Sequence, residues 1–177
     1  MAERITKRPS RGIRKPPAPG TSFDAGLRLL GRRAHSRAEL QRKLARRGYE
    51  GDEVESTVAR LAEMGYLDDA AFARGLVRRR SQTRGSLALA GELAGKGIDR
   101  EGAAIALVGL DEEAELAAAT RLAERLYAAK PSPGYRETLN TVGAKLARRG
   151  FPAGVVRAAC RTVLQSAVGA ASEGSDA

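Results

Sequence analysis

The chain has 177 residues, of which 42% are hydrophobic but only 4% aromatic. A core without many large rings has to be built from Leu, Val and Ala, which favours helices over a β-sandwich. Lys and Arg number 31 against 21 Asp and Glu, a net charge of +10, and a basic protein of this size often binds a polyanion. The single cysteine, Cys160, excludes an internal disulfide.

The two ends of the chain have compositions typical of disordered segments. Residues 1–22 hold clustered Arg and Lys and four of the seven prolines, so they cannot bury much apolar surface. About half of the net charge lies in this basic tail. Residues 169–177 are small and polar, and we expect both ends to be disordered. The sequence lacks a membrane-spanning apolar run and a signal peptide, so we expect a cytoplasmic protein.

Helix signals begin after the basic tail. A first helix is expected at about residues 23–34. Ser36 and Glu39 then fit a capping box, Leu40 and Leu44 supply an apolar stripe, and Gly48 ends this second helix.

The capping pattern recurs further along the chain. Asp52 and Glu55 predict the start of a third helix, which Gly65 ends. Asp68 is expected to cap a helix over residues 68–83, with Phe72 on its inner face. Another helix is expected over residues 112–129.

The pattern Leu-x-x-[Arg/Lys]-Gly-apolar occurs three times in the sequence. The three copies are Leu44, Gly48 and Tyr49; Leu93, Gly97 and Ile98; and Leu146, Gly150 and Phe151. Such repetition is typical of helical-repeat proteins, in which neighbouring modules bury what one cannot bury alone. We therefore expect an all-α fold of three tandem three-helix repeats, residues 23–67, 68–110 and 111–168, forming an elongated, curved chain.

Residue types that carry catalysis or bind metals are scarce. The only histidine, His35, is expected to be a polar residue in a turn between helices. Cys160 occupies the place of Val58 and Leu107 in the other repeats, which predicts a core residue. The sequence shows neither ligand spacing for a metal nor a Walker-type phosphate loop. We expect no enzyme, no cofactor and no metal site.

Basic residues concentrate in three runs, at residues 28–37, 42–47 and 74–84. Arg74, Arg78 and Arg79 lie in the middle of a predicted helix, where like charges one turn apart are destabilising, so an anionic partner is expected. Cations near Gly48, Gly97 and Gly150 are equally well explained by the helix dipole. The helix that opens with Asp52 would be repelled by a DNA groove, which disfavours sequence-specific binding but leaves salt-dependent phosphate contacts open.

Several of these stretches resemble the RecX family. Residues 27–49, from Leu27-Arg28-Leu29-Leu30 to Arg47-Gly48-Tyr49, resemble the opening of RecX proteins. The most specific element is Gly65-Tyr66-Leu67-Asp68-Asp69 followed by Phe72, and residues 96–98 and 148–151 resemble the later repeats. The resemblance extends over about residues 23–165. One departure is the uncharged run after Gly85, where the family usually carries basic residues, so the second helix of that module is expected to be weaker.

The resemblance implies a regulatory protein that binds RecA filaments on DNA. RecX proteins inhibit or modulate RecA ATPase, strand exchange and coprotease activity, and so limit recombinational repair and the SOS response. Direct contacts to the phosphates of ssDNA and dsDNA and a monomeric state are further expectations. The residues expected to bind RecA or DNA are Arg32, Arg33, Arg42, Lys43, Arg74, Arg78, Arg79 and Arg84.

Two other functions stay open from the residues alone. One is a nonspecific DNA-binding protein that uses its basic tail and helices, with a steep dependence on salt. The other is a helical-repeat adaptor for a different protein, in which the basic residues are merely solvated.

Overall fold

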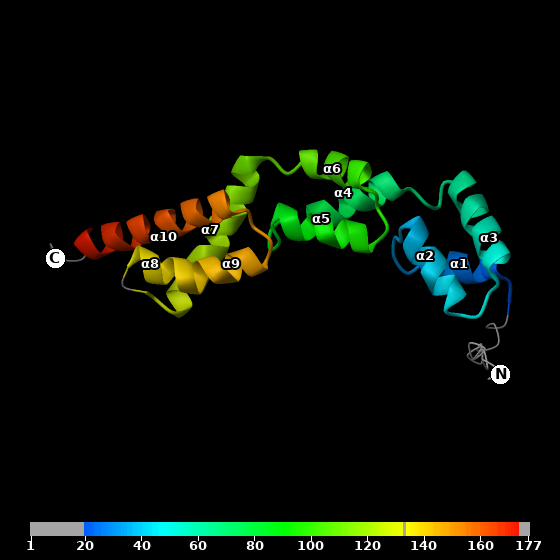
Figure 1. Cartoon of the computed structure of the whole chain (residues 1–177), viewed down its shortest axis with the longest axis horizontal. Helices are drawn as coiled ribbons and strands as arrows, with labels where there is room; N and C mark the ends of the chain where they lie inside the picture. The colour runs from blue at the N-terminus through cyan, green and yellow to red at the C-terminus, as the bar shows by residue number, and fades with distance from the viewer. Residues whose placement is uncertain (1–19, 133, 174–177) are drawn as a thin grey trace, which may run out of the picture. The chain divides into compact units, whose positions relative to one another are not determined.

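The computed structural model describes residues 20–132 and 134–173, so most of the basic tail, residues 1–19, and residues 174–177 lie outside the described residues. The elements within these ranges are all helices (Figure 1), which confirms the expected all-α fold. They belong to two compact units that divide between Leu67 and Asp68, and each unit is described by itself.

The first unit contains α1 (Ser22–Leu30), α2 (Arg37–Ala45) and α3 (Gly51–Glu63). Helix α1 begins within the segment that was expected to be disordered, because Thr21 and Asp24 form a reciprocal capping box. It ends at Leu30 and not near residue 34, since Gly31 already caps it.

Two of the three predicted side-chain caps are found. Ser36 accepts a hydrogen bond from the Glu39 backbone N–H at 3.1 Å, and Asp68 accepts one from Ala71 at 2.9 Å. The cap at Asp52 was wrong, because α3 begins at Gly51 and its N-cap is Glu50, two residues before Asp52. Asp52 therefore lies inside the first turn, where its charge still complements the helix dipole.

The second unit contains two groups of helices. The first group is α4 (Asp69–Arg80), α5 (Ser86–Gly95) and α6 (Arg100–Val108). The second group is α7 (Glu112–Ala129), the segment α8 (Tyr135–Thr138), η1 (Leu139–Gly143) and α9 (Ala144–Arg148), and α10 (Ala153–Glu173). Helix α10 continues through residues 169–173, which the sequence placed in a disordered tail.

Each group of helices has its own hydrophobic core. The fully buried residues include Leu40, Leu44 and Leu61 in the first unit, Leu89 and Leu93 among helices α4 to α6, and Leu146 and Cys160 among helices α7 to α10. The burial of Cys160 agrees with its expected place in the core. Three separate cores are what a chain of three-helix modules requires.

The repeated glycines end helices in the same way. Gly48, Gly97 and Gly150 have φ angles of +93°, +81° and +81°, a conformation that residues with a Cβ adopt at a cost. In the second and third copies, the residue after the glycine donates its backbone N–H to the carbonyl of the repeated leucine. Ile98 donates to Leu93 at 3.0 Å, and Phe151 donates to Leu146 at 3.3 Å.

Backbone hydrogen bonds join the two helix groups of the second unit. The Gly85 N–H donates to the Arg149 carbonyl at 3.0 Å, and the Leu87 N–H donates to the Gly150 carbonyl at 3.1 Å. A Cβ at Gly85 would overlap the Gly150 carbonyl and the Phe151 backbone. The close approach of these two chain segments therefore depends on glycine.

Candidate partner-binding surface

On helix α4, Arg74 and Arg78 lie on the side opposite to Phe72 and Leu76, and Val77 borders the two arginines. Phe72, Leu76 and Val77 are buried, whereas Arg74 and Arg78 are exposed. Among the described residues, neither Arg74 nor Arg78 has an ion-pair partner. The repulsion between two guanidinium groups one turn apart is therefore not compensated within this part of the chain.

An open groove of about 470 Å³ lies in the second unit, between α4, α6 and the start of α7. Arg74 and Arg78 line it from α4, and Ile105, Leu110 and other small or apolar residues line the opposite side. The lining residues are Arg74, Val77, Arg78, Ser81, Gln82, Ile105, Ala106, Gly109, Leu110 and Ala114. This groove, called the α4–α6 groove below, combines positive charge with apolar surface.

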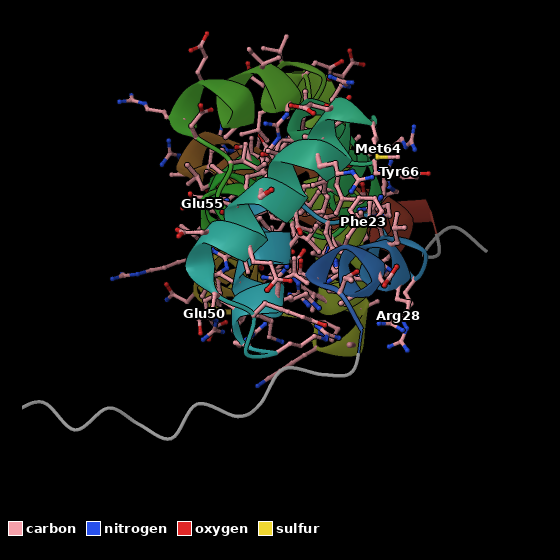
Figure 2. All side chains as sticks on the ribbon, turned by 90° about the vertical axis from the view of Figure 1, so that its right-hand side faces the viewer. Phe23, Arg28, Glu50, Glu55, Met64 and Tyr66 are labelled. Atoms are coloured by element: carbon pink, nitrogen blue, oxygen red, sulfur yellow. The ribbon has the colours of Figure 1, made fainter. Side chains whose placement is uncertain are left out.

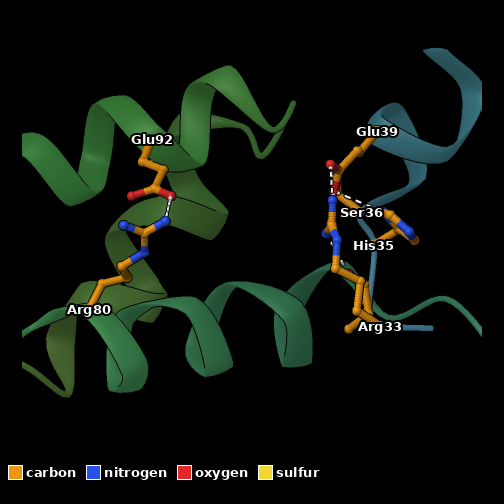
Figure 3. Close-up of polar contacts among 7 residues, drawn as sticks. Arg33, His35, Ser36, Glu39, Arg80 and Glu92 are labelled. Atoms are coloured by element: carbon orange, nitrogen blue, oxygen red, sulfur yellow. Dashed lines mark hydrogen bonds and ion pairs between the residues drawn. The ribbon is translucent and has the colours of Figure 1, made fainter. Parts of the chain in front are cut away.

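The other predicted arginines of this unit do not line the α4–α6 groove. The Arg79 guanidinium lies against Gly75 on its own helix. Arg80, the next residue, forms an ion pair with Glu92 of α5 at 3.3 Å (Figure 3). Arg84 is exposed just before the Gly85 junction.

The four predicted binding residues of the first unit differ in their surroundings. Arg32 and Arg42 are exposed, and Lys43 is half-buried. Arg33 is bound by Glu39, to which it donates two hydrogen bonds of 2.7 and 3.1 Å (Figure 3). Because Glu39 is buried, this pairing gives Arg33 a structural role, and it raises the pKa of Arg33.

His35 belongs to the same cluster. It is buried, and its Nδ1 lies 3.0 Å from Oε2 of Glu39 (Figure 3), although the angles do not make a hydrogen bond. Burial lowers the pKa of His35, the Glu39 carboxylate opposes that shift, and the charge of Arg33 adds to it. His35 is thus a core residue of the turn between α1 and α2.

The first unit also has two surfaces of opposite character. Figure 2 shows Glu50 and Glu55 on one side and Phe23, Met64 and Tyr66 on the other. Met64 and Tyr66 are each 52% exposed, and the Phe23 ring is covered by the Arg60 guanidinium at 4.4 Å. The acidic side of α3 would repel DNA phosphates, and the absence of sequence-specific DNA binding by this helix stays a prediction.

Sequence patterns did not reveal the apolar side of the α4–α6 groove. Ile105 is 60% exposed on α6, next to the buried Ala106. The available signal was an aliphatic side chain outside the apolar stripe of its helix. Such a signal is weak, because single exposed aliphatic residues are common on protein surfaces.

The described part of the chain offers no metal centre and no membrane span. Among residues 20–132 and 134–173, no group of three or more His, Cys, Asp or Glu side chains is placed to hold a metal ion. None of the helices in these ranges is both long and apolar enough to cross a bilayer.

These features define a helical-repeat protein built of three-helix modules with basic surfaces. Family models match two of the modules, the first three-helix domain of RecX over residues 23–61 and the second over residues 68–107. The chain belongs to the RecX family, whose members are regulatory proteins that modulate RecA and are not enzymes.

Two relatives are similar in sequence to most of the chain. The regulatory protein RecX of Stenotrophomonas maltophilia strain R551-3 is 36% identical over 151 residues, which is 85% of this chain and 91% of the relative. That of Mycolicibacterium vanbaalenii is 41% identical over 133 residues, covering 71% and 72% of the two chains. The fold is similar to the crystal structure of RecX from Lactobacillus salivarius, with a TM-score of 0.72, 23% identity, and coverage of 80% and 94%.

Proposed function

We propose that this chain binds RecA filaments on DNA and thereby inhibits or modulates RecA ATPase, strand exchange and coprotease activity. In this way it limits recombinational repair and the SOS response. Membership of the RecX family supports RecA as the binding partner. The chain acts as a monomer in the cytoplasm, where RecA acts on the chromosome, and its modules at about residues 23–67, 68–110 and 111–168 each contribute surface.

The observation that carries the proposal is the pair Arg74 and Arg78. These guanidinium groups lie one helical turn apart, exposed, and without an ion-pair partner among the described residues. An anionic partner compensates their repulsion. Arg32, Arg42, Lys43, Arg79 and Arg84 are proposed as further contacts, whereas Arg33 contributes mainly through its bond to Glu39.

DNA phosphates within the filament are a proposed secondary contact. Such contacts weaken steeply with salt, because each neutralised phosphate releases counterions. If bare DNA were instead the main ligand, the chain would have to coat the DNA before it affected RecA.

The test is ssDNA-dependent ATP hydrolysis by RecA, titrated with this protein at constant salt. A change in ATPase well below one molecule per RecA protomer, with ssDNA in excess, is the expected result. A change that appears only when the protein is abundant enough to cover the DNA would replace this proposal with nonspecific DNA binding. An unchanged ATPase at every ratio would indicate an adaptor for another protein.

A further inference from the structure

The α4–α6 groove has two kinds of wall. One wall carries Arg74 and Arg78, and the other carries Ile105 and Leu110. Ile105 is 60% exposed, and the neighbouring Val108 is 81% exposed. When a partner covers apolar side chains that otherwise lie in water beside a charged groove, their burial stabilises the complex.

This combination fits a polypeptide better than a nucleic-acid backbone. A phosphate backbone is bound by cations and hydrogen-bond donors, and it gains little from an aliphatic wall. A volume of about 470 Å³ falls within the range of pockets that enclose small ligands, and it accommodates a few side chains. The two unpaired arginines favour an occupant that carries negative charge.

Acidic residues near the groove favour one orientation of the occupant. Asp111, the N-cap of helix α7, and Glu112, its first residue, are exposed close to Ala114, which lines the groove. They would repel a carboxylate placed beside them, whereas Arg74 and Arg78 attract it on the α4 side. The acidic part of the occupant therefore lies against α4, and its apolar part lies towards Ile105 and Leu110.

We propose that the α4–α6 groove docks a segment of a protein partner in which an acidic side chain lies next to an aliphatic one. The carboxylate binds Arg74 and Arg78, and the aliphatic side chain packs on Ile105 and Leu110. This inference rests on the proposed function in taking the same arginines as a contact surface, but it assigns them to protein and not to phosphate.

The test uses amide NMR spectra of the full chain with three probes. These are a short peptide of alternating Glu and Leu, a matched peptide of alternating Glu and Ser, and a short single-stranded oligonucleotide. We expect the Glu-Leu peptide to shift the amide signals of Val77, Ile105 and Leu110 most strongly, because it alone offers both charge and apolar surface.

Two variants locate the apolar contact. Ile105→Ser should weaken binding of the Glu-Leu peptide by roughly three- to tenfold, as expected when about half of an isoleucine side chain is no longer buried. Leu87→Ser is the control, since Leu87 is 64% exposed in the same unit but does not line the groove, and it should leave that binding unchanged. The amide spectra also verify that each variant is folded.

Several outcomes would overturn the inference. The groove amides would respond to the oligonucleotide more than to either peptide, or to both peptides equally, or to no probe. Failure of the proposed function is a different result: RecA filaments would not bind the wild-type chain, while the Glu-Leu peptide still shifted the groove amides.

Discussion

Glu115 of α7 caps a helix that belongs to the preceding module. Its Oε1 accepts a hydrogen bond from the Ser86 backbone N–H at 2.6 Å. Helix α5 needs this bond, because its N-cap is Gly85, which has no side chain, and its first turn holds no acid. The uncharged start of α5, which predicted a weak helix, is thus compensated by a carboxylate distant in sequence.

Replacing Glu115 should destabilise the second unit. Glu115→Ala removes both the acceptor and a charge near the helix N-terminus, and we expect a loss of about 1–2 kcal/mol in the free energy of unfolding. Glu115→Gln keeps an acceptor and should cost less. Urea denaturation followed by circular dichroism measures the difference.

The control is Glu124→Ala on the same helix. Glu124 is exposed, so its loss should change the free energy of unfolding by less than about 0.5 kcal/mol. Equal effects at Glu115 and Glu124 would show that the interhelical bond does not stabilise α5.

The close approach at Gly85 leads to a second prediction. Its φ of −80° suits alanine, but the added Cβ would collide with the backbone of the facing segment. Gly85→Ala should therefore cost about 2 kcal/mol or more by forcing the two modules apart. Hydrogen exchange at the Leu87 amide, which donates to Gly150, should accelerate.

Gly91→Ala should change the free energy of unfolding in the opposite direction. Gly91 lies inside α5, and a Cβ there would meet nothing within 4 Å. Gly91→Ala should stabilise the protein by about 0.5–1 kcal/mol, since alanine is the better helix former. Stabilisation by both substitutions would contradict the proposed contact at Gly85.

Local residues determine the features of this fold that could be predicted. A single glycine with positive φ ends α2, α5 and α9, so the repeat of Gly48, Gly97 and Gly150 was visible in the sequence. The boundaries at Ser22 and Glu173 were not, because they depend on a cap at Thr21 and on the continuation of α10 through a small, polar stretch.

The candidate site was predictable only in its charged half. Arg74 and Arg78 were recognisable as like charges in the middle of a helix. Ile105 joins them through the packing of α6 beside α4, which no local pattern specifies. Likewise, the pairing of Arg33 with Glu39 depends on the turn between α1 and α2, so Arg33 looked like any exposed arginine.

The buried His35 predicts how stability depends on pH. Burial lowers its pKa below the ordinary value of 6.5, so below that value the unfolded chain binds a proton more readily than the folded one. The groups facing it are Glu39, Arg33 and Lys43, and burial outweighs the favourable charge of Glu39. The free energy of unfolding should therefore fall as the pH drops below about 6.5.

His35→Gln should remove this dependence, because His35 is the only histidine in the chain. The measurement is urea denaturation of both proteins at about pH 7.5 and about pH 5.5. The wild type should lose more stability than the variant over this interval. Parallel losses would mean that the titration of His35 does not differ between the folded and unfolded states.

Arg74 and Arg78 should matter for RecA modulation beyond their contribution to net charge. Arg74→Ala with Arg78→Ala should raise the concentration needed to change RecA ATPase several-fold, because it removes two uncompensated cations from the α4–α6 groove. It should not unfold the protein, since both side chains are exposed and the removal of like charges one turn apart relieves repulsion.

The matched control is Arg157→Ala with Arg161→Ala, an exposed pair of the same spacing on α10. If both double variants weakened the effect equally, the net charge would be responsible and not the groove. If only the α4 pair did so, the groove would be the surface that contacts the filament.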